Sequence, residues 1–379
     1  MIDRFGMYHW YGRPGLFVLA LLLIAPLVGC NPDADFRPEA RGEEGRITIV
    51  MDSSRWNGAV GEALREQITR DIPTLPAPEP SFDIRQVNLG SQRQLDDVQT
   101  YNNLVIVAPL SDSTNEANLI RSVFSPEAQE AVQEGNAAIV GREDVWRRRQ
   151  QVFYITAATP EALTQKIRQD GSVLVDSFNV VTRDRLYREM FDRGRQDDLE
   201  EQLMASHDFA VNVQHDYQIA LDTTQFVWLR RVLPETWRSL FVYYEENADP
   251  STLTQEWVYA TRDSLGQAHL KGSIEGYHVM IDYRRPLSTE EVNFEGRYAL
   301  ESRGLWIIAR EDASGNLIID GGGPFLNYSF YDQATGRLYM IDGMVFAPGH
   351  DKREFLRQME VIAHTFRTRQ ESEDPVAAR

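Results

Sequence analysis

Cysteine and lysine are the two residue types that this sequence lacks most clearly. Cys30 is the only cysteine among 379 residues, and only three of the 39 basic residues are lysines. A chain with one thiol forms no internal disulfide and holds no metal through paired cysteines. Its stability must therefore come from burial, for which a hydrophobic content of 42% is sufficient.

Catalytic and cofactor-binding motifs are also missing from the sequence. It contains no HExxH metal site, no GxSxG or SxxK nucleophile, and no Walker A or GxGxxG phosphate loop. We therefore predict no catalytic residue, no cofactor and no metal, and we expect a protein that is not an enzyme. The formal net charge of −18 argues against nucleic acid as a partner, because phosphate binding needs a basic face.

The N-terminal residues have the pattern of an export signal. Arg4 and Arg13 precede an apolar run of 13 residues, Leu16–Val28, which is shorter than the roughly 20 residues that span a bilayer. The run ends in Leu-Val-Gly-Cys at Cys30 and resembles the lipobox of bacterial lipoproteins. The resemblance implies cleavage after residue 29 and lipid attachment at Cys30. The alternatives are an uncleaved signal anchor, or a secreted protein whose cysteine is incidental.

The pattern of strands and helices predicts an α+β fold with two mixed α/β domains and antiparallel-rich sheets. We expect a signal peptide at 1–29, a flexible tether at 30–45, an N-terminal domain with a helical junction at 46–193, a C-terminal domain at 194–368 and a disordered tail at 369–379. The helical stretch 160–207, with a break at Gly171, is the predicted domain junction.

The C-terminal half is rich in predicted strands and ends in an amphipathic helix. Phe355, Met359, Ile362 and Phe366 form one apolar stripe, which we expect to pack on the sheet. Asp351, with Glu354 three residues later, predicts a capping box at the start of this helix. The glycine run Gly321–Phe325 is interpreted as a turn between strands rather than a ligand-binding loop.

Two pairs of aromatic and basic residues are the candidate binding residues. Trp228 lies two positions before Arg230, and Arg303 lies three positions before Trp306. Arginine beside tryptophan suits stacking on a sugar or gripping a carboxylate. The competing interpretation is a strand whose tryptophan faces the core while its arginine faces water. Neighbouring His–Asp residues are interpreted as structural, since adjacent strand residues face opposite ways. Paired glutamates are interpreted as chance neighbours in a chain with 57 acidic residues.

Several stretches together resemble a family of uncharacterised lipoproteins, mostly from Bacteroidetes, catalogued as domain of unknown function 4837. These include ITIVMDSSRWNGAVGEALR, NLVIVAPL, FVWLRR, ESRGLW, GGGPFLNYSFYD and GMVFAPGHDKREFLRQMEVI. The resemblance covers nearly the whole chain after Cys30 and implies an envelope lipoprotein, without any catalytic residue to transfer. The final strands and closing helix also resemble the ending of PsbP/Mog1-type sandwiches, a likeness of fold alone.

The predicted role is a lipid-anchored binding or assembly module of the cell envelope, on the periplasmic or outer-membrane side. Its partners would be the membrane, through the lipid at Cys30, and an envelope protein or glycan. One alternative is an envelope hydrolase that acts on glycan or peptide through an unmarked site. The other is a solute-binding lipoprotein.

Overall fold

The computed structural model describes residues 35–192 and 194–373. The predicted signal peptide, Cys30 and the last six residues lie outside this part of the chain. The described residues from Arg37 onward form one compact unit, so the domain boundary expected after residue 193 stays a prediction. Among the described residues, no helix combines the length and the apolar character that crossing a bilayer requires.

The N-terminal half is built on a five-stranded sheet with strand order β2-β1-β3-β5-β4. Its strands are β1 (Arg46–Val50), β2 (Asp83–Val87), β3 (Asn103–Val107), β4 (Ala138–Glu143) and β5 (Gln151–Thr156). β1, β2, β3 and β5 run parallel, and only β4 is antiparallel to its neighbour. All residues of β3 and β5 are buried, which explains their continuous apolar runs.

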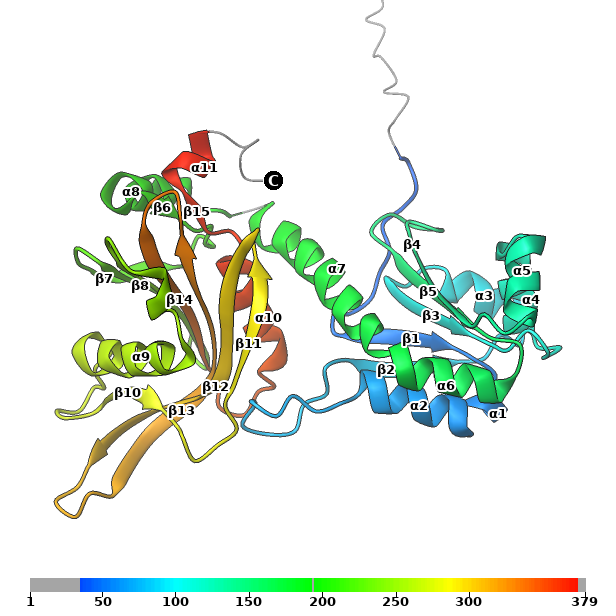
Figure 1. The fold of residues 1–379 in the computed structure, drawn as a ribbon, viewed down its shortest axis with the longest axis horizontal. Helices are drawn as coiled ribbons and strands as arrows, with labels where there is room; N and C mark the ends of the chain where they lie inside the picture. The colour runs from blue at the N-terminus through cyan, green and yellow to red at the C-terminus, as the bar shows by residue number, and fades with distance from the viewer. Residues whose placement is uncertain (1–34, 193, 374–379) are drawn as a thin grey trace, which may run out of the picture. The chain divides into compact units, whose positions relative to one another are not determined.

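Helices cover both faces of this sheet (Figure 1). They are α1 (Ser53–Trp56), α2 (Ala59–Ile68), α3 (Gln92–Val98), α4 (Asn115–Val123), α5 (Pro126–Gln133), α6 (Pro160–Asp170) and α7 (Ser172–Phe191). α2, α6 and the start of α7 share one apolar cluster, and α3 to α5 share another on the opposite face. The predicted break at Gly171 is confirmed, because α6 ends there and α7 begins at the next residue.

The C-terminal half is built on an eight-stranded sheet with order β10-β12-β13-β14-β9-β8-β7, in which β11 also pairs with β12. The strands are β7 (Gln218–Asp222), β8 (Phe226–Val232), β9 (Trp237–Glu245), β10 (His278–Ile281), β11 (Ser288–Phe294), β12 (Arg297–Glu311), β13 (Leu317–Asp332) and β14 (Arg337–Phe346). Every pairing in it is antiparallel. The predicted α+β class is confirmed, and the antiparallel character belongs to this large sheet and not to the five-stranded one.

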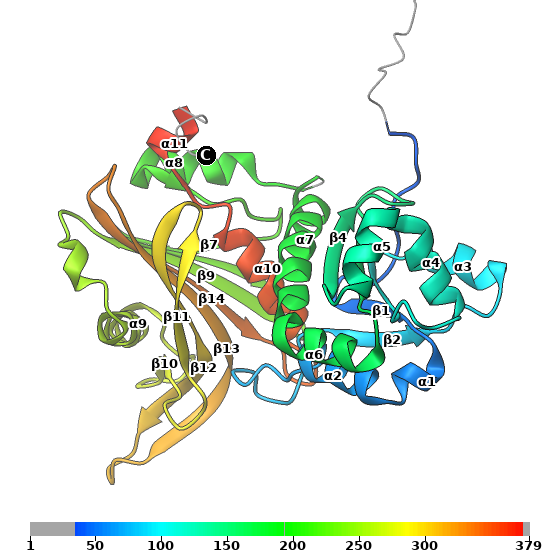
Figure 2. The same cartoon turned by 45° about the vertical axis from the view of Figure 1, so that its right-hand side comes forward.

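The remaining elements lie on or beside the large sheet. They are α8 (Asp197–His207), the 3-10 turn η1 (Pro250–Thr252), α9 (Gln255–His269), α10 (Arg353–Ala363), the small ladder of β6 (Phe209–Ala210) with β15 (Arg367–Thr368), and α11 (Arg369–Glu373). α9 and α10 pack on opposite faces of the sheet (Figure 2). Met359 and Ile362 are buried against it, as the apolar stripe predicts.

The cap of α10 differs from the sequence prediction. The N-cap residue is Lys352, and it makes no side-chain capping bond. Instead, the buried carboxylate of Glu79 accepts hydrogen bonds from the backbone N–H groups of Lys352 and Arg353, at 2.9 and 2.8 Å. The predicted capping box at Asp351 is therefore wrong. A residue from the proline-rich loop of the N-terminal half satisfies the helix end in its place.

Three further segments differ from expectation. The glycine run Gly321–Phe325 lies inside β13 and is not a turn. Residues 38–41, expected in the tether, hydrogen-bond to the backbone of Thr100 and Arg148. In the predicted tail, residues 369–373 form α11, whose Glu371 pairs with Arg297. Each difference arises from pairing with residues far away in the chain, which local pattern does not reveal.

Candidate ligand-binding pocket

The α9 face of the C-terminal sheet contains a cavity of about 430 Å³ near the end of α9. Its floor is formed by strands β8, β9, β12, β13 and β14. One wall is formed by residues 270–273, which follow α9. The side chains that matter most are those of Trp228, Arg230, Trp237, Lys271, Trp306, Asp320 and Phe346. The structure therefore brings together three of the four candidate binding residues.

Aromatic rings form most of the floor of this pocket. The ring centroids of Trp237 and Phe346 are 4.4 Å apart, and Trp306 lies 6.3 Å from Trp237. Trp306 is 2% exposed, and its indole N–H donates to the carbonyl of Pro324 at 3.1 Å. Trp306 is therefore fixed, while the other two rings present apolar surface to the cavity.

Trp228 differs from Trp306 in its hydrogen bonding. Its indole nitrogen is buried but has no hydrogen-bond partner among the described residues. A buried donor without a partner loses its hydration without compensation. Trp228 is therefore held by its contact with Arg230 rather than by a hydrogen bond of its indole N–H, unlike Trp306.

Two cations border the pocket without an acidic partner. The guanidinium of Arg230 stacks over the ring of Trp228, 4.8 Å from its centroid. Neither Arg230 nor Lys271 forms an ion pair within the described part of the chain, although Lys271 donates to the backbone carbonyl of Gln267. Asp320 is the one carboxylate among the lining residues. In a chain of net charge −18, this local excess of positive charge favours an anionic group on the ligand.

Strand alternation explains which candidates meet in the pocket. Residues two apart on a strand share a face, so Trp228 and Arg230 both point toward α9. Arg303 and Trp306 are three apart and lie on opposite faces of β12. The Arg303 side chain contacts Glu301 and reaches Glu360 of α10 at 3.3 Å. Arg303 is thus placed away from the pocket.

The surroundings of Arg303 are those of a structural ion-pair network. Burial alone would lower the pKa of Arg303, but the carboxylates of Glu301 and Glu360 raise it above its usual value. Glu360 also pairs with Arg183 of α7 at 2.7 Å. These contacts join α10 to the sheet and to α7.

Trp237, Lys271 and Phe346 line the pocket but were not among the sequence candidates. Trp237 and Phe346 are paired directly across β9 and β14. Side chains alternate between the two faces of a strand, and this alternation places both residues on the apolar face of the sheet. That pattern is the feature of the sequence from which they could have been found. Lys271 lies in a loop, and nothing in its local sequence indicates the pocket.

Three histidines pair with acidic side chains outside this pocket. His207 is 3% exposed, with Nε2 2.8 Å from Asp222 Oδ1 and Nδ1 3.2 Å from the Tyr244 hydroxyl. His364 Nδ1 lies 2.6 Å from Glu295, whose pKa is lowered chiefly by that contact. Within residues 35–192 and 194–373, no group of three or more histidine, cysteine or acidic residues has the geometry of a metal site.

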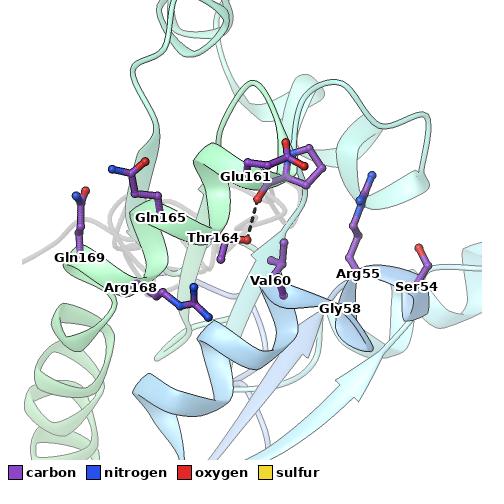
Figure 3. A pocket seen from close by; sticks show the side chains of 11 residues that line it. Ser54, Arg55, Gly58, Val60, Glu161, Thr164, Gln165, Arg168 and Gln169 are labelled. Atoms are coloured by element: carbon purple, nitrogen blue, oxygen red, sulfur yellow. Dashed lines mark hydrogen bonds between the residues drawn. The ribbon is translucent and has the colours of Figure 1, made fainter.

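A second cavity, of about 530 Å³, lies between α1–α2 and α6 (Figure 3). It is near the carboxyl ends of β1 and β5, where parallel α/β sheets often bind ligands. Its two arginines are already paired: Arg55 makes a bidentate contact with Asp112 at 2.7–2.8 Å, and Arg168 lies 3.5 Å from Glu66. The aromatic pocket, with its unpaired cations and its group of aromatic rings, is the stronger candidate.

Two family models match the chain. Residues 196–365 match the model described as Domain of unknown function (DUF4837), and residues 40–191 match Domain of unknown function (DUF8532). The predicted resemblance is confirmed for the C-terminal half. The N-terminal half, which the quoted motifs also covered, matches a different family. No curated protein matches the chain significantly.

Among solved structures, the Ran-binding protein Mog1p of Saccharomyces cerevisiae is 10% identical, with a TM-score of 0.30. The match covers 44% of this chain and 92% of that one. A second Mog1 structure, a mutant, is also 10% identical, with a TM-score of 0.28, and the match covers 42% of this chain and 90% of that one. The expected likeness to Mog1 is therefore present but weak.

Proposed function

We propose that this chain, whose C-terminal half carries the DUF4837 domain, is a lipid-anchored envelope protein that binds a ligand in the aromatic pocket. The observation that carries the proposal is the convergence of Trp228, Trp237 and Phe346 with two unpaired cations around one cavity. Such a site suits a ligand with an apolar or aromatic group and an anionic group. The chain acts in this proposal as a binding module rather than as an enzyme.

The anchoring part of the proposal rests on Cys30 and the apolar run before it. Two or more acyl chains are needed for stable membrane attachment, because one chain binds only reversibly. We expect the wild type to incorporate a palmitate analogue and to sediment with membranes. The Cys30→Ser variant should do neither, and its continued tight membrane binding would refute the anchor.

The binding part can be tested with 1-anilinonaphthalene-8-sulfonate, an aromatic sulfonate that combines the two expected features. We expect saturable fluorescence enhancement by the protein lacking residues 1–30. Substituting Trp237→Ala or Arg230→Gln should weaken binding about tenfold, because each removes a stacking surface or a charge. Arg93→Gln, an exposed arginine of α3, is the matched control. Equal affinity of all variants would refute a role for this pocket.

A further inference from the structure

The β12–β13 hairpin has an open edge next to the aromatic pocket. β13 begins at Leu317, but its pairing with β14 begins only at Phe325 opposite Met344. Residues 317–322 therefore run along β12 on one side and pair with no strand on the other, whereas Gly323 already lies against Val345 of β14. The hairpin extends past the neighbouring strands (Figure 1).

This edge presents unpaired backbone groups. In an antiparallel strand, alternate N–H and C=O groups point away from the paired neighbour, so an edge of this length offers a row of donors and acceptors. Native edges are usually short, charged or covered. Here Ile318 and Ile319 are 38% and 42% exposed, and Asp320 lies at a β-bulge opposite the Ile308–Ala309 step. The edge is long and largely apolar.

The glycine run leaves the backbone at this edge accessible. Gly321 lines the aromatic pocket, and Gly322 follows it on the same edge. A Cβ at Gly321 would meet only the ring of Phe346, at 3.4 Å, whereas the close approach at Gly322 is that of the Trp306 carbonyl oxygen in the paired strand β12. A strand added here would continue the line of β14 beyond Phe346, and every second side chain would point toward the pocket.

We propose that the open edge of β13 at 317–322 binds an extended acidic peptide by β-strand addition, with one apolar side chain entering the aromatic pocket. This proposal rests on the binding role proposed above for that pocket. An extended backbone satisfies a whole row of edge groups, which a sugar or a small solute does not. The unpaired cations Arg230 and Lys271 favour acidic residues beside the inserted side chain.

A second copy of this chain is the less suitable occupant. Antiparallel pairing of 317–322 with itself would set Asp320 of one copy opposite Ile319 of the other, so a second copy would bring a carboxylate but no aromatic side chain to this edge. Each copy also carries a formal charge of −18. A short peptide with two glutamates carries far less negative charge than a second copy, and its acidic side chains can lie beside Arg230 and Lys271.

The probe is the capped peptide Ac-Ser-Glu-Val-Phe-Val-Glu-Ser-NH2, whose phenylalanine and glutamates share one face when extended. Two N-methylated versions serve as controls, one blocked at the amides of Glu, Phe and Glu, the other at those of the two valines. In an extended peptide only one of these two groups of amides faces β13 and can donate hydrogen bonds to it. We therefore expect the version methylated at that group to bind about tenfold weaker and the other version to bind like the parent. Equal binding of all three, or no binding of the parent, would overturn the proposal.

Protein variants and hydrogen exchange locate the contact. Ile318→Glu places a like charge on the edge and should weaken binding of the acidic peptide, while Tyr298→Glu, at an exposed position near the other end of β12, should not. Amides of 317–322 should exchange quickly in the free protein and slowly with saturating peptide. Absence of that protection would exclude strand addition. If the peptide does not bind but sulfonate binding still depends on Arg230 and Trp237, only the inference of strand addition is refuted. If sulfonate binding does not depend on these residues either, the proposed function is refuted as well.

Discussion

Arg262 of α9 and Asp342 of β14 form a bidentate ion pair, with Nε–Oδ2 at 2.8 Å and Nη2–Oδ1 at 3.2 Å. The two side chains are 1% and 0% exposed. The guanidinium also lies 3.8 Å from the ring centroid of Phe325, and Asn327 donates to Asp342 at 3.0 Å. This pair sets α9 in a defined position over the sheet, and thereby sets the wall of the pocket that follows α9.

Removing one member of this pair should be strongly destabilising. Arg262→Met leaves Asp342 buried without its cation, and we expect a loss of about 3–5 kcal/mol in the free energy of unfolding by urea. Combining it with Asp342→Leu should recover part of that loss, because no buried charge then remains. A double variant whose loss equals the sum of the two single losses would contradict this coupling.

Glu79 should stabilise α10, although it comes from the other half of the chain. Glu79→Ala removes the acceptor of the Lys352 and Arg353 N–H groups and should cost about 1–2 kcal/mol in thermal or urea unfolding. Asp351→Ala is the matched control, since Asp351 is exposed and is not the cap of α10. A capping box at Asp351 would instead make Asp351→Ala the more destabilising of the two variants. Comparing the two losses in stability therefore distinguishes capping by Glu79 from capping by Asp351.

Stability should fall on acidification in part because of Glu360. Burial raises the pKa of Glu360, but Arg303, Arg183 and His364 lower it more, so the net pKa lies below 4.5. As the pH falls, the Glu360 carboxylate is therefore protonated in the unfolded chain before it is protonated in the folded one. The stability that the charged carboxylate contributes is present above pH 4.5 and is lost as the pH falls through the folded pKa.

Glu360→Gln should therefore be less stable than the wild type by about 1–2 kcal/mol at pH 7. The difference should shrink below the usual glutamate pKa of 4.5. Urea unfolding at a series of pH values measures it, with Glu201→Gln, an exposed position on α8, as control. A difference that stays constant from pH 7 to pH 3 would show that the charge of Glu360 contributes nothing.

The glycines of β13 should differ sharply in their tolerance of a side chain. A Cβ at Gly323 would come within 1.9 Å of the Val345 carbonyl oxygen, whereas a Cβ at Gly321 would meet Phe346 at 3.4 Å. We expect Gly323→Ala to cost about 2 kcal/mol or more and Gly321→Ala about 0.5 kcal/mol or less in urea unfolding. Similar losses in the two variants would contradict the close approach of β13 and β14.

Local sequence was sufficient for elements whose pattern is also local. β3 and β5 are short apolar runs buried on both faces, and the stripe of α10 follows helical spacing. The sequence of β11, STEEVNF, does not by itself indicate a strand, because it is mostly polar and half exposed, with little alternation. It forms a strand because it pairs along β12.

Sequence reasoning reached part of the site for the same reason. Trp228 and Arg230 are neighbours whose spacing of two residues places them on one face of β8. Arg303 and Trp306 were predicted with equal weight, although a spacing of three residues puts them on opposite faces of β12. The strand period, applied to each pair, distinguishes these two cases from the sequence alone.

The sequence by itself determined that the described body contains no disulfide, since the lone cysteine is Cys30, and it determined which residues along each strand share a face. Only the tertiary structure decided that Trp237, Lys271 and Phe346 meet Trp228 in one cavity, and that Glu79 caps a helix 273 residues away. Periodicity is a property of neighbouring residues, whereas strand order and register depend on long-range pairing, which the chain acquires only when it folds.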